Sequence, residues 1–356
     1  MKNKPTIWLL SAYCSDSHAA WAKNLLETFT DYHWHKLELP GRFFRWRIRG
    51  NPLSWLHSLP QQQPDLILAT SMVDLATLKG LHPRLANTPC VYYFHENQFA
   101  YPTRQQQHHS VDPQMVQLYG ALAANYLLFN SEYNRSSFLD GVDQLLKKLP
   151  DEVPENITHL LKEKSRVLPV AIKPGIKQKY KNIEPLILWN HRWEYDKAPE
   201  IFANALVELK QKNKAFKLLL LGDRAAQKPE ALLKIESLLK DHILVNEKVS
   251  REQYLNYLSQ ADIVVSSAIH EFQGLSMLEA VSAGATPLVP NDLCYKEQYK
   301  NIFRYPRGNS HALANKLNEW LSYDIPAAPD VSYWHSESLQ QQWQDILSVA
   351  CQVQAN

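Results

Sequence analysis

Residues 261–280 decide the fold, and they read ADIVVSSAIHEFQGLSMLEA. The β-branched apolar run Ile263–Val265 predicts a buried parallel strand, and a short polar loop follows it. A helix then begins at Gly274, since the apolar side chains of Leu275 and Leu278 recur at helical spacing. The stretch therefore predicts a strand, a loop and a helix in succession.

Such a junction suits an anionic ligand, because the first amides of a helix lack intrahelical partners and the helix dipole places about half a positive charge there. Gly274 has no Cβ to obstruct a ligand. Glu271 and Glu279 frame the turn with carboxylates that accept hydrogen bonds from hydroxyl groups, so we predict a polyol beside a phosphate. The alternative is that Glu271 is an exposed loop residue and Glu279 a solvated helix residue, as most glutamates are.

The totals exclude several classes of protein. The chain has 356 residues, of which 45% are hydrophobic and 21% charged, as expected for a soluble globular protein of two domains. A net charge of +2 means that any nucleic-acid surface must be a local cluster. No apolar run approaches the ~20 residues of a membrane span, and the N-terminus shows no signal-peptide pattern. The four cysteines form no C-x-x-C pair, so we expect a reduced, cytoplasmic protein with no structural zinc site and no stable membrane association.

Short apolar runs alternate with helical patterns along most of the chain, which is typical of α/β folds. The predicted strands are residues 6–12, 35–39, 65–69, 90–94, 126–129 and 166–172, then 186–189, 216–221, 243–245, 263–265 and 286–289. The predicted helices are residues 18–29, 114–124 and one from 131, then 198–212, 229–240, 252–260, 310–323 and 336–349.

The alternation is interrupted once, at a lysine-rich segment without apolar periodicity. We therefore predict an N-terminal domain at 1–172, an interdomain linker at 173–184 and a C-terminal domain at 185–330. Residues 331–356 are expected to form a final helix that packs back onto the first domain. Both domains are predicted to be doubly wound α/β units.

Polar residues follow the strand at 90–94, where ligands collect in open parallel sheets. They make His95 and Glu96 site candidates in the first domain. The alternative for His95 is a histidine satisfied by local backbone, and helix-capping neighbours also explain His18. The first strand is not followed by G-x-G-x-x-G, which excludes a dinucleotide site of the usual kind.

The loop after the first strand of the second domain reads NHRWEYDK at residues 190–197. It brings Arg192 and Lys197 to the start of the next helix. The forked donors of an arginine and the point charge of a lysine can neutralise a diphosphate there without a metal. The alternative is two solvated loop cations.

Together, Glu271, Gly274, Glu279, Arg192 and Lys197 resemble the donor site of retaining GT-B glycosyltransferases of family four. The resemblance implies a GT-B fold, with two Rossmann-like domains facing across a cleft. It also implies that Glu271 and the amides after it hold the donor sugar, that Glu279 holds the ribose, and that the two cations hold the diphosphate. The donor-binding candidates are Glu279, Gly274, Leu275, Ser276 and Asn246.

The N-terminal half is similar to a narrower group, the tRNA-queuosine mannosyltransferase family. The likeness runs over most of residues 6–305, and it is carried by AY at 12–13 through SH at 17–18, FFRWRIRG at 43–50, TSMVDL at 70–75, YFHENQ at 93–98, FNS at 129–131 with Asn134, and HEF at 270–272. It implies transfer of mannose from GDP-mannose to the cyclopentene-diol of queuosine in the anticodon loop of tRNA(Asp). The catalytic candidates are His95, Arg192, Lys197 and Glu271; the candidates for acceptor and tRNA binding are His18, Arg45, Trp46, Arg47, Arg49, Glu96 and Asn97.

The segment 42–49 holds four arginines among three aromatic residues and an isoleucine. As a strand it would place Arg45, Arg47 and Arg49 on one face, where they would bind backbone phosphates, while an exposed aromatic ring would stack on an unpaired base. The alternative is a half-buried edge strand with a solvated face.

Two other functions stay open: a GT-B enzyme that builds a cell-surface glycan, and a non-catalytic GT-B protein that binds tRNA. No cofactor or metal is expected beyond the donor substrate. The residues do not distinguish mannose from galactose, and they leave the oligomeric state open.

Overall fold

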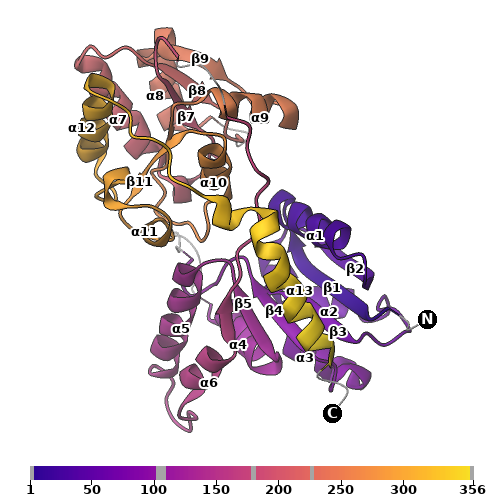
Figure 1. Ribbon diagram of the computed structural model, residues 1–356. Coiled ribbons are helices and arrows are strands. Elements are labelled where there is room, and N and C mark those ends of the chain that lie inside the picture. The colour runs from indigo at the N-terminus through magenta and orange to yellow at the C-terminus, as the bar shows by residue number, and fades with distance from the viewer. Residues whose placement is uncertain (1–3, 102–109, 178–181, 225–227, 353–356) are drawn as a thin grey trace. The chain divides into compact units, whose positions relative to one another are not determined.

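The computed structural model describes residues 4–101, 110–177, 182–224 and 228–352, and it divides into two compact units (Figure 1). The first unit comprises residues 1–170 together with 339–356, and the second comprises residues 171–338. Part of the expected linker, residues 178–181, lies outside the described residues.

The first unit is built on a six-stranded sheet in the order β2-β1-β3-β4-β5-β6, and every strand pair is parallel. Its strands are β1 Thr6–Cys14, β2 His33–Pro40, β3 Leu66–Thr70, β4 Cys90–Phe94, β5 Tyr126–Phe129 and β6 Ser165–Val167. Its helices are α1 Asp16–Thr28, α2 Phe44–Ser54, α3 Leu75–Leu81, α4 Asp112–Ala123, α5 Glu132–Leu146, α6 Ile157–Glu163 and most of α13 Ser336–Gln352.

Neighbouring residues of β4 show which helices cover which face of this sheet, because successive side chains of a strand point to opposite faces. Tyr92 lies against Gly120 of α4, which packs with α2 and α3. Tyr93 instead contacts Trp21 of α1, at 4.8 Å between ring centroids, and Trp343 of α13, at 5.4 Å. Helices α1 and α13 therefore cover one face of the sheet, and α2, α3 and α4 cover the other (Figure 1).

The second unit has its own parallel sheet of six strands, in the order β12-β11-β10-β7-β8-β9. Its strands are β7 Leu186–Trp189, β8 Lys217–Leu220, β9 Ile243–Asn246, β10 Ile263–Val265, β11 Thr286–Pro290 and β12 Arg304–Tyr305. Its helices are α7 Pro199–Gln211, α8 Glu230–Leu238, α9 Arg251–Gln260, α10 Leu275–Ser282, α11 Tyr295–Gln298 and α12 Ser310–Ser322.

These two sheets confirm the predicted doubly wound α/β architecture. Among the described residues, no helix is both long enough and apolar enough to cross a membrane.

The strand considered for residues 42–49 does not form, because residues 44–49 form the start of α2 and Phe43 is its N-cap. Their aromatic and basic residues fit a helical period as well as a strand period. Phe44 packs edge-on against Tyr13 at 6.2 Å between centroids, and Ile48, one turn later, is buried. Arg45, Arg47 and Arg49 therefore do not share one face.

The predicted strand at 166–172 is also shorter than expected. Leu168 still donates its amide to the Phe129 carbonyl, at 2.8 Å, but Pro169 has no N–H with which to continue the ladder. Strand β6 therefore ends at Val167.

The turn between β2 and α2 depends on Gly41. Its amide donates to the Cys14 carbonyl at 3.0 Å, and a Cβ on Gly41 would lie 2.7 Å from the same oxygen. We expect Gly41→Ala to lower the free energy of unfolding by about 1–3 kcal/mol, because the backbone must move to relieve the overlap. Urea unfolding followed by circular dichroism measures the change.

Gly80→Ala is the matched control. Gly80 lies inside α3, and no neighbouring atom of the described residues lies within 4 Å of the position that its Cβ would take. Alanine favours a helix by about 1 kcal/mol over glycine, so this variant should be as stable as the parent or more so. Equal destabilisation by both substitutions would contradict the role of Gly41.

Candidate functional site

The loops after β7 and β10 are joined by the buried ammonium group of Lys197. Its Nζ donates to the carbonyl of His270 and to Glu271 Oε2, each at 3.0 Å, and it lies 3.0 Å from Asp196 Oδ2. Only 9% of its side chain is exposed. Three partners match the three protons of an ammonium group, so a phosphate can bind Lys197 only by replacing one of them.

This pairing keeps both Glu271 and Lys197 charged. Burial raises the pKa of a carboxyl group, but Lys197 outweighs burial here and lowers the pKa of Glu271 to about 2. Burial likewise lowers the pKa of Lys197, and Glu271 and Asp196 reverse that effect and raise it above its ordinary value. The carboxylate also accepts the amide of Phe272, at 3.2 Å.

His191 lies beside this ion pair and was not predicted. It is buried, its Nε2 has no hydrogen-bond partner among the described residues, and its ring packs on Trp189 at 5.3 Å between centroids. Burial, reinforced by the nearby charge of Lys197, lowers the pKa of His191 to about 4. The imidazole is therefore neutral near pH 7.

Glu279 belongs to a second network. Arg251 donates to both of its carboxylate oxygens, and the hydroxyl of Tyr254 donates to Oε2 at 3.2 Å. Asn190, at the end of β7, donates to the Tyr254 hydroxyl at 3.2 Å and to the carbonyl of Ser276 at 2.8 Å. The carboxylate is held in place from α9 and retains lone pairs for one more donor.

Helix α10 begins where the sequence predicts, with Gly274 at its N-cap in the left-handed region, at φ 66°. Few side chains adopt that conformation, which accounts for glycine here. The amides of Leu275 and Ser276 fall in the first turn and have no intrahelical acceptor. The start of α10 therefore presents backbone donors beside Glu271.

The other two residues predicted to bind the donor substrate, Arg192 and Asn246, differ in how accessible their side chains are. Arg192 has 54% of its side chain exposed and donates to Glu194 Oε1 at 3.1 Å, so its guanidinium remains accessible. Asn246 instead donates to Glu236 at 2.7 Å and accepts from Arg224, so both ends of its amide are used at the end of β9. The guanidinium of Arg192 is thus open to solvent, whereas the side chain of Asn246 has internal partners.

In the first unit, His18 and His95 stack at 4.2 Å between ring centroids. His18 Nδ1 lies 2.8 Å from the Tyr13 carbonyl, so Nδ1 carries the proton and donates it. Burial lowers the pKa of both rings, well below the ordinary value for His95, where the neighbouring His18 adds to the effect. In the part of the chain that the structure describes, His95 Nε2 has no hydrogen-bond partner. The structure thus brings two predicted residues together as a neutral pair.

The residues after His95 support the loop. Asn97 is fully buried and donates to Asn134 and Ser137. The sequence suggested that Asn97 contacts tRNA, but its buried side chain is not placed to do so. The backbone carbonyl of Glu96 accepts from Ser71, at 2.9 Å. Asn97 therefore shapes the end of β4 instead of contacting an acceptor.

The predicted tRNA-binding residues of α2 have different environments. Arg45 and Trp46 are exposed, Arg47 is half-buried, and Arg49 donates to the buried Asp74 at 2.7 Å. Asp74 also caps α3. Arg49 is therefore partly committed to holding α2 and α3 together.

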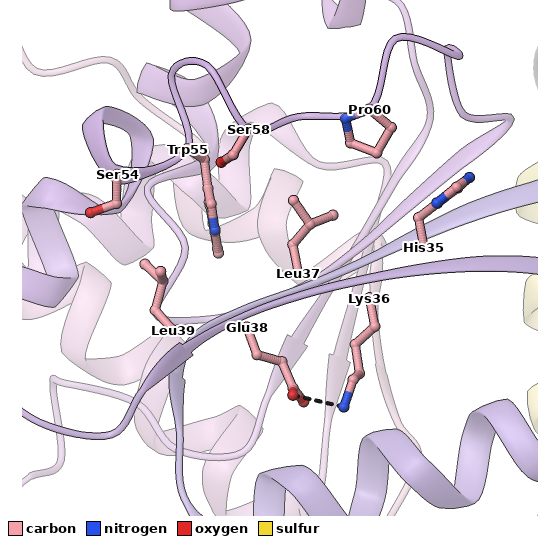
Figure 2. Close-up of a pocket in the computed structure, with 9 residues that line it drawn as sticks. All are labelled: His35, Lys36, Leu37, Glu38, Leu39, Ser54, Trp55, Ser58 and Pro60. Atoms are coloured by element: carbon pink, nitrogen blue, oxygen red, sulfur yellow. Dashed lines mark ion pairs between the residues drawn. The ribbon is translucent and has the colours of Figure 1, made fainter.

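A groove of about 490 Å³ lies between β2 and the residues at the end of α2 (Figure 2). Leu37 and Leu39 point toward Trp55, whereas Lys36 and Glu38 form an ion pair of 2.7 Å on the other side of the strand. None of the predicted donor or acceptor residues lines this groove.

Sequence reasoning missed Arg251, Tyr254, His191 and Asp196. His191 and Asp196 lie in the loop 190–197, from which only Arg192 and Lys197 were predicted as site residues. Arg251 and Tyr254 are three residues apart, which places them on one face of a helix, but nothing local indicates that this face meets Glu279.

Two family models match the chain. The model described as tRNA-queuosine alpha-mannosyltransferase N-terminal matches residues 6–172, and the model described as glycosyl transferases group 1 matches residues 174–330. A tRNA-queuosine alpha-mannosyltransferase from Drosophila melanogaster is 34% identical over 327 residues, which cover 88% of this chain and 86% of that protein.

Three solved structures share the fold at low sequence identity. Sucrose-phosphate synthase from Thermosynechococcus elongatus has a TM-score of 0.74 at 13% identity and covers 97% of this chain and 98% of its own. HepE from Anabaena, in complex with UDP and glucose, has 0.65 at 16% and covers 97% and 100%. The lipopolysaccharide outer core galactosyltransferase WaaB has 0.66 at 11% and covers 96% and 99%.

Acid unfolding tests the pair of Lys197 and Glu271. The pKa of Glu271 is lowered from 4.5 to about 2, so the unfolded chain takes up the proton first as the pH falls. The stabilisation is complete above about pH 5 and is lost as the pH falls toward 2. Between pH 6 and pH 3 we expect the parent to lose about 2 kcal/mol more stability than Glu271→Gln.

Urea unfolding at several pH values measures this difference. Glu194→Gln is the control, because Glu194 is an exposed carboxylate of the same site and should leave the pH dependence as it is in the parent. The same pH dependence in the parent and in Glu271→Gln would contradict the pairing.

Proposed function

We propose that this chain, which belongs to the tRNA-queuosine alpha-mannosyltransferase family, transfers mannose from GDP-mannose to the cyclopentene-diol of queuosine in the anticodon loop of tRNA(Asp). The chain is a glycosyltransferase, since its second unit matches the group 1 family. The observation that carries the proposal is the 34% identity to the Drosophila melanogaster enzyme, which extends over 88% of the chain and hence over both units.

The second unit is suited to the donor. Glu279, fixed by Arg251 and Tyr254, would accept a hydrogen bond from a ribose hydroxyl. The first amides of α10 and the exposed guanidinium of Arg192 would hold the diphosphate. These donors supply positive charge where the departing diphosphate gains negative charge, and we expect no metal to be needed.

We propose retention at the anomeric carbon, as the resemblance to family four implies. The acceptor hydroxyl would attack on the face from which the diphosphate leaves, while the bond from the anomeric carbon to the β-phosphate oxygen breaks. A phosphate oxygen would take the acceptor proton. The side chains favour this route, because Glu271 has a pKa of about 2 and is bound to Lys197, which makes it a weak base.

The first unit would supply the acceptor side. Burial lowers the pKa of His95, so its ring stays neutral and is better suited to donate or accept a hydrogen bond than to take a full proton. We propose that its Nε2, which no other described residue bonds, forms a hydrogen bond with the reacting sugar or the acceptor diol.

Mass spectrometry of the product tests the proposal. The protein is incubated with queuosine-containing tRNA(Asp) and, separately, GDP-mannose or UDP-galactose. The tRNA is then digested to nucleosides. We expect queuosine to gain the mass of one hexose with GDP-mannose only, and the same transcript without queuosine to gain nothing.

Other results would replace the proposal. Transfer from UDP-galactose alone would change the sugar, and transfer to other queuosine-containing tRNAs at equal rates would remove the aspartate specificity. Binding of tRNA without turnover of either donor would indicate a non-catalytic protein.

Removal of the Arg192 guanidinium should slow the reaction without unfolding the chain, because the side chain is exposed. We expect Arg192→Ala to lower kcat by roughly 10²–10³, the effect of losing one donor to the transition state. Steady-state kinetics with GDP-mannose measure it. Lys316→Ala is the control, since Lys316 forms an exposed ion pair on α12. An unchanged kcat in Arg192→Ala would remove Arg192 from the diphosphate site.

A further inference from the structure

The start of α2 exposes two large aromatic rings. Phe43, the N-cap residue of α2, is 70% exposed, and Trp46, in the first turn of the helix, is 49% exposed. Phe43 also has a left-handed backbone, with φ at 55°, which is costly for a bulky residue. A residue with an exposed ring and a strained backbone contributes little to the stability of the fold, so packing does not explain the position of Phe43.

Arginines surround these rings. Residues 41–50 include four arginines and no acidic residue. The guanidinium of Arg42 lies over the ring of Phe43, with its carbon 5.5 Å from the ring centroid. Arg45 is exposed between the two aromatic residues in the sequence. Phe43 thus has a cation over its ring, and Trp46 has one beside it in the sequence.

We propose that this surface, the α2 face formed by Arg42, Phe43, Arg45 and Trp46, binds single-stranded RNA by stacking on unpaired bases. Aromatic rings stack on bases at roughly 1–3 kcal/mol for each base, whatever the sequence, and arginines neutralise the adjoining phosphates. The proposal rests on the proposed function for the identity of the RNA, a tRNA whose anticodon loop contains unpaired bases.

The α2 face is connected to the neutral histidine pair within the same unit. Phe44, the residue after Phe43, packs against the ring of Tyr13, and the carbonyl of Tyr13 accepts from His18, which stacks on His95. All of them lie at the carboxyl end of β1, β2 or β4, where parallel sheets hold their ligands. A base stacked on Phe43 or Trp46 would therefore leave the next nucleotides of the loop near His18.

A membrane surface is the other partner that basic and aromatic residues can bind. The α2 face does not suit it well, because a helix that lies in a membrane needs a continuous apolar face. Here exposed arginines interrupt the aromatic residues, and Phe44 and Ile48 face inward. Charge and ring spacing favour RNA.

The experiment separates stacking from charge. Fluorescence anisotropy measures the Kd of the full chain for an unmodified tRNA(Asp) transcript and for a single-stranded RNA of the anticodon loop, at several salt concentrations. We expect Phe43→Ala with Trp46→Ala to weaken both by roughly 10–100-fold with an unchanged salt slope. Arg42→Gln with Arg45→Gln should flatten the salt slope by about 1.4.

Matched variants show whether the rings themselves matter. Phe43→Tyr with Trp46→Phe keeps two rings and should restore binding to within a few-fold of the parent. Leu53→Ala removes an exposed apolar side chain, 60% exposed, from the same helix and should leave Kd unchanged. The affinity for GDP-mannose should stay the same in every variant, which confirms that the second unit is intact.

The proposal would be overturned if the variant Phe43→Ala with Trp46→Ala bound RNA as tightly as the parent, or if Leu53→Ala weakened binding equally. It would also be overturned if the parent bound phosphatidylserine vesicles and the double alanine variant lost that binding while it kept its RNA affinity. The proposed function fails separately. If the alanines weaken RNA binding but the parent transfers no hexose, the α2 face stands and the reaction does not.

Discussion

The second unit depends on the buried ion pair between Lys197 and Glu271. Lys197 follows β7 and Glu271 follows β10, two strands that are adjacent in the sheet, so one ammonium group fixes the loops at neighbouring strand ends. The amides of Ile269 and His270 add to this connection by donating to the Asp196 carbonyl, at 2.9 and 3.2 Å. Removal of Lys197 would leave Glu271 buried without its counter-ion, which costs about 3–5 kcal/mol, whereas removal of Glu271 would leave Lys197 paired with Asp196. The geometry of the candidate donor site is therefore a consequence of the same contacts that hold the unit together.

A second connection starts from the same strand. Asn190 joins the end of β7 to the first turn of α10 through Ser276, and to α9 through Tyr254. Tyr254 in turn orients Glu279. The two glutamates that frame the start of α10 are thus held by different networks, one buried and ionic, the other partly exposed and built from a hydroxyl and a guanidinium. A ligand can therefore reach Glu279 without breaking a buried ion pair, whereas a ligand of Glu271 meets a carboxylate that is already bound to Lys197.

The sequence predicted the inner strands of both sheets well, because they are buried on both faces and read as continuous apolar runs. It predicted Tyr126–Phe129 and Leu186–Trp189 with the observed bounds. It failed at α2, because the apolar residues there fit a helical period as well as a strand period. The ring of Tyr13, against which Phe44 packs, is also 31 residues away in the sequence. For the same reason the partners of Glu279 were missed: contacts between elements leave no mark in local spacing. The resemblance placed Lys197 and Glu271 in one site, but it did not show that the two groups neutralise each other.

The two units solve the electrostatic problem of a glycosyl transfer in different ways. In the second unit Lys197 and Glu271 are charged and paired, which lowers the pKa of Glu271 to about 2, while the neighbouring His191 is neutral. In the first unit burial lowers the pKa of His18 and His95, so both rings are neutral. Neither arrangement provides a group that would accept a proton readily near pH 7, because the carboxylate is too acidic and the imidazoles are held neutral by burial. Under the proposed reaction, the acceptor proton must therefore leave with the diphosphate, and the protein contributes by position and fixed charge instead of by general base catalysis.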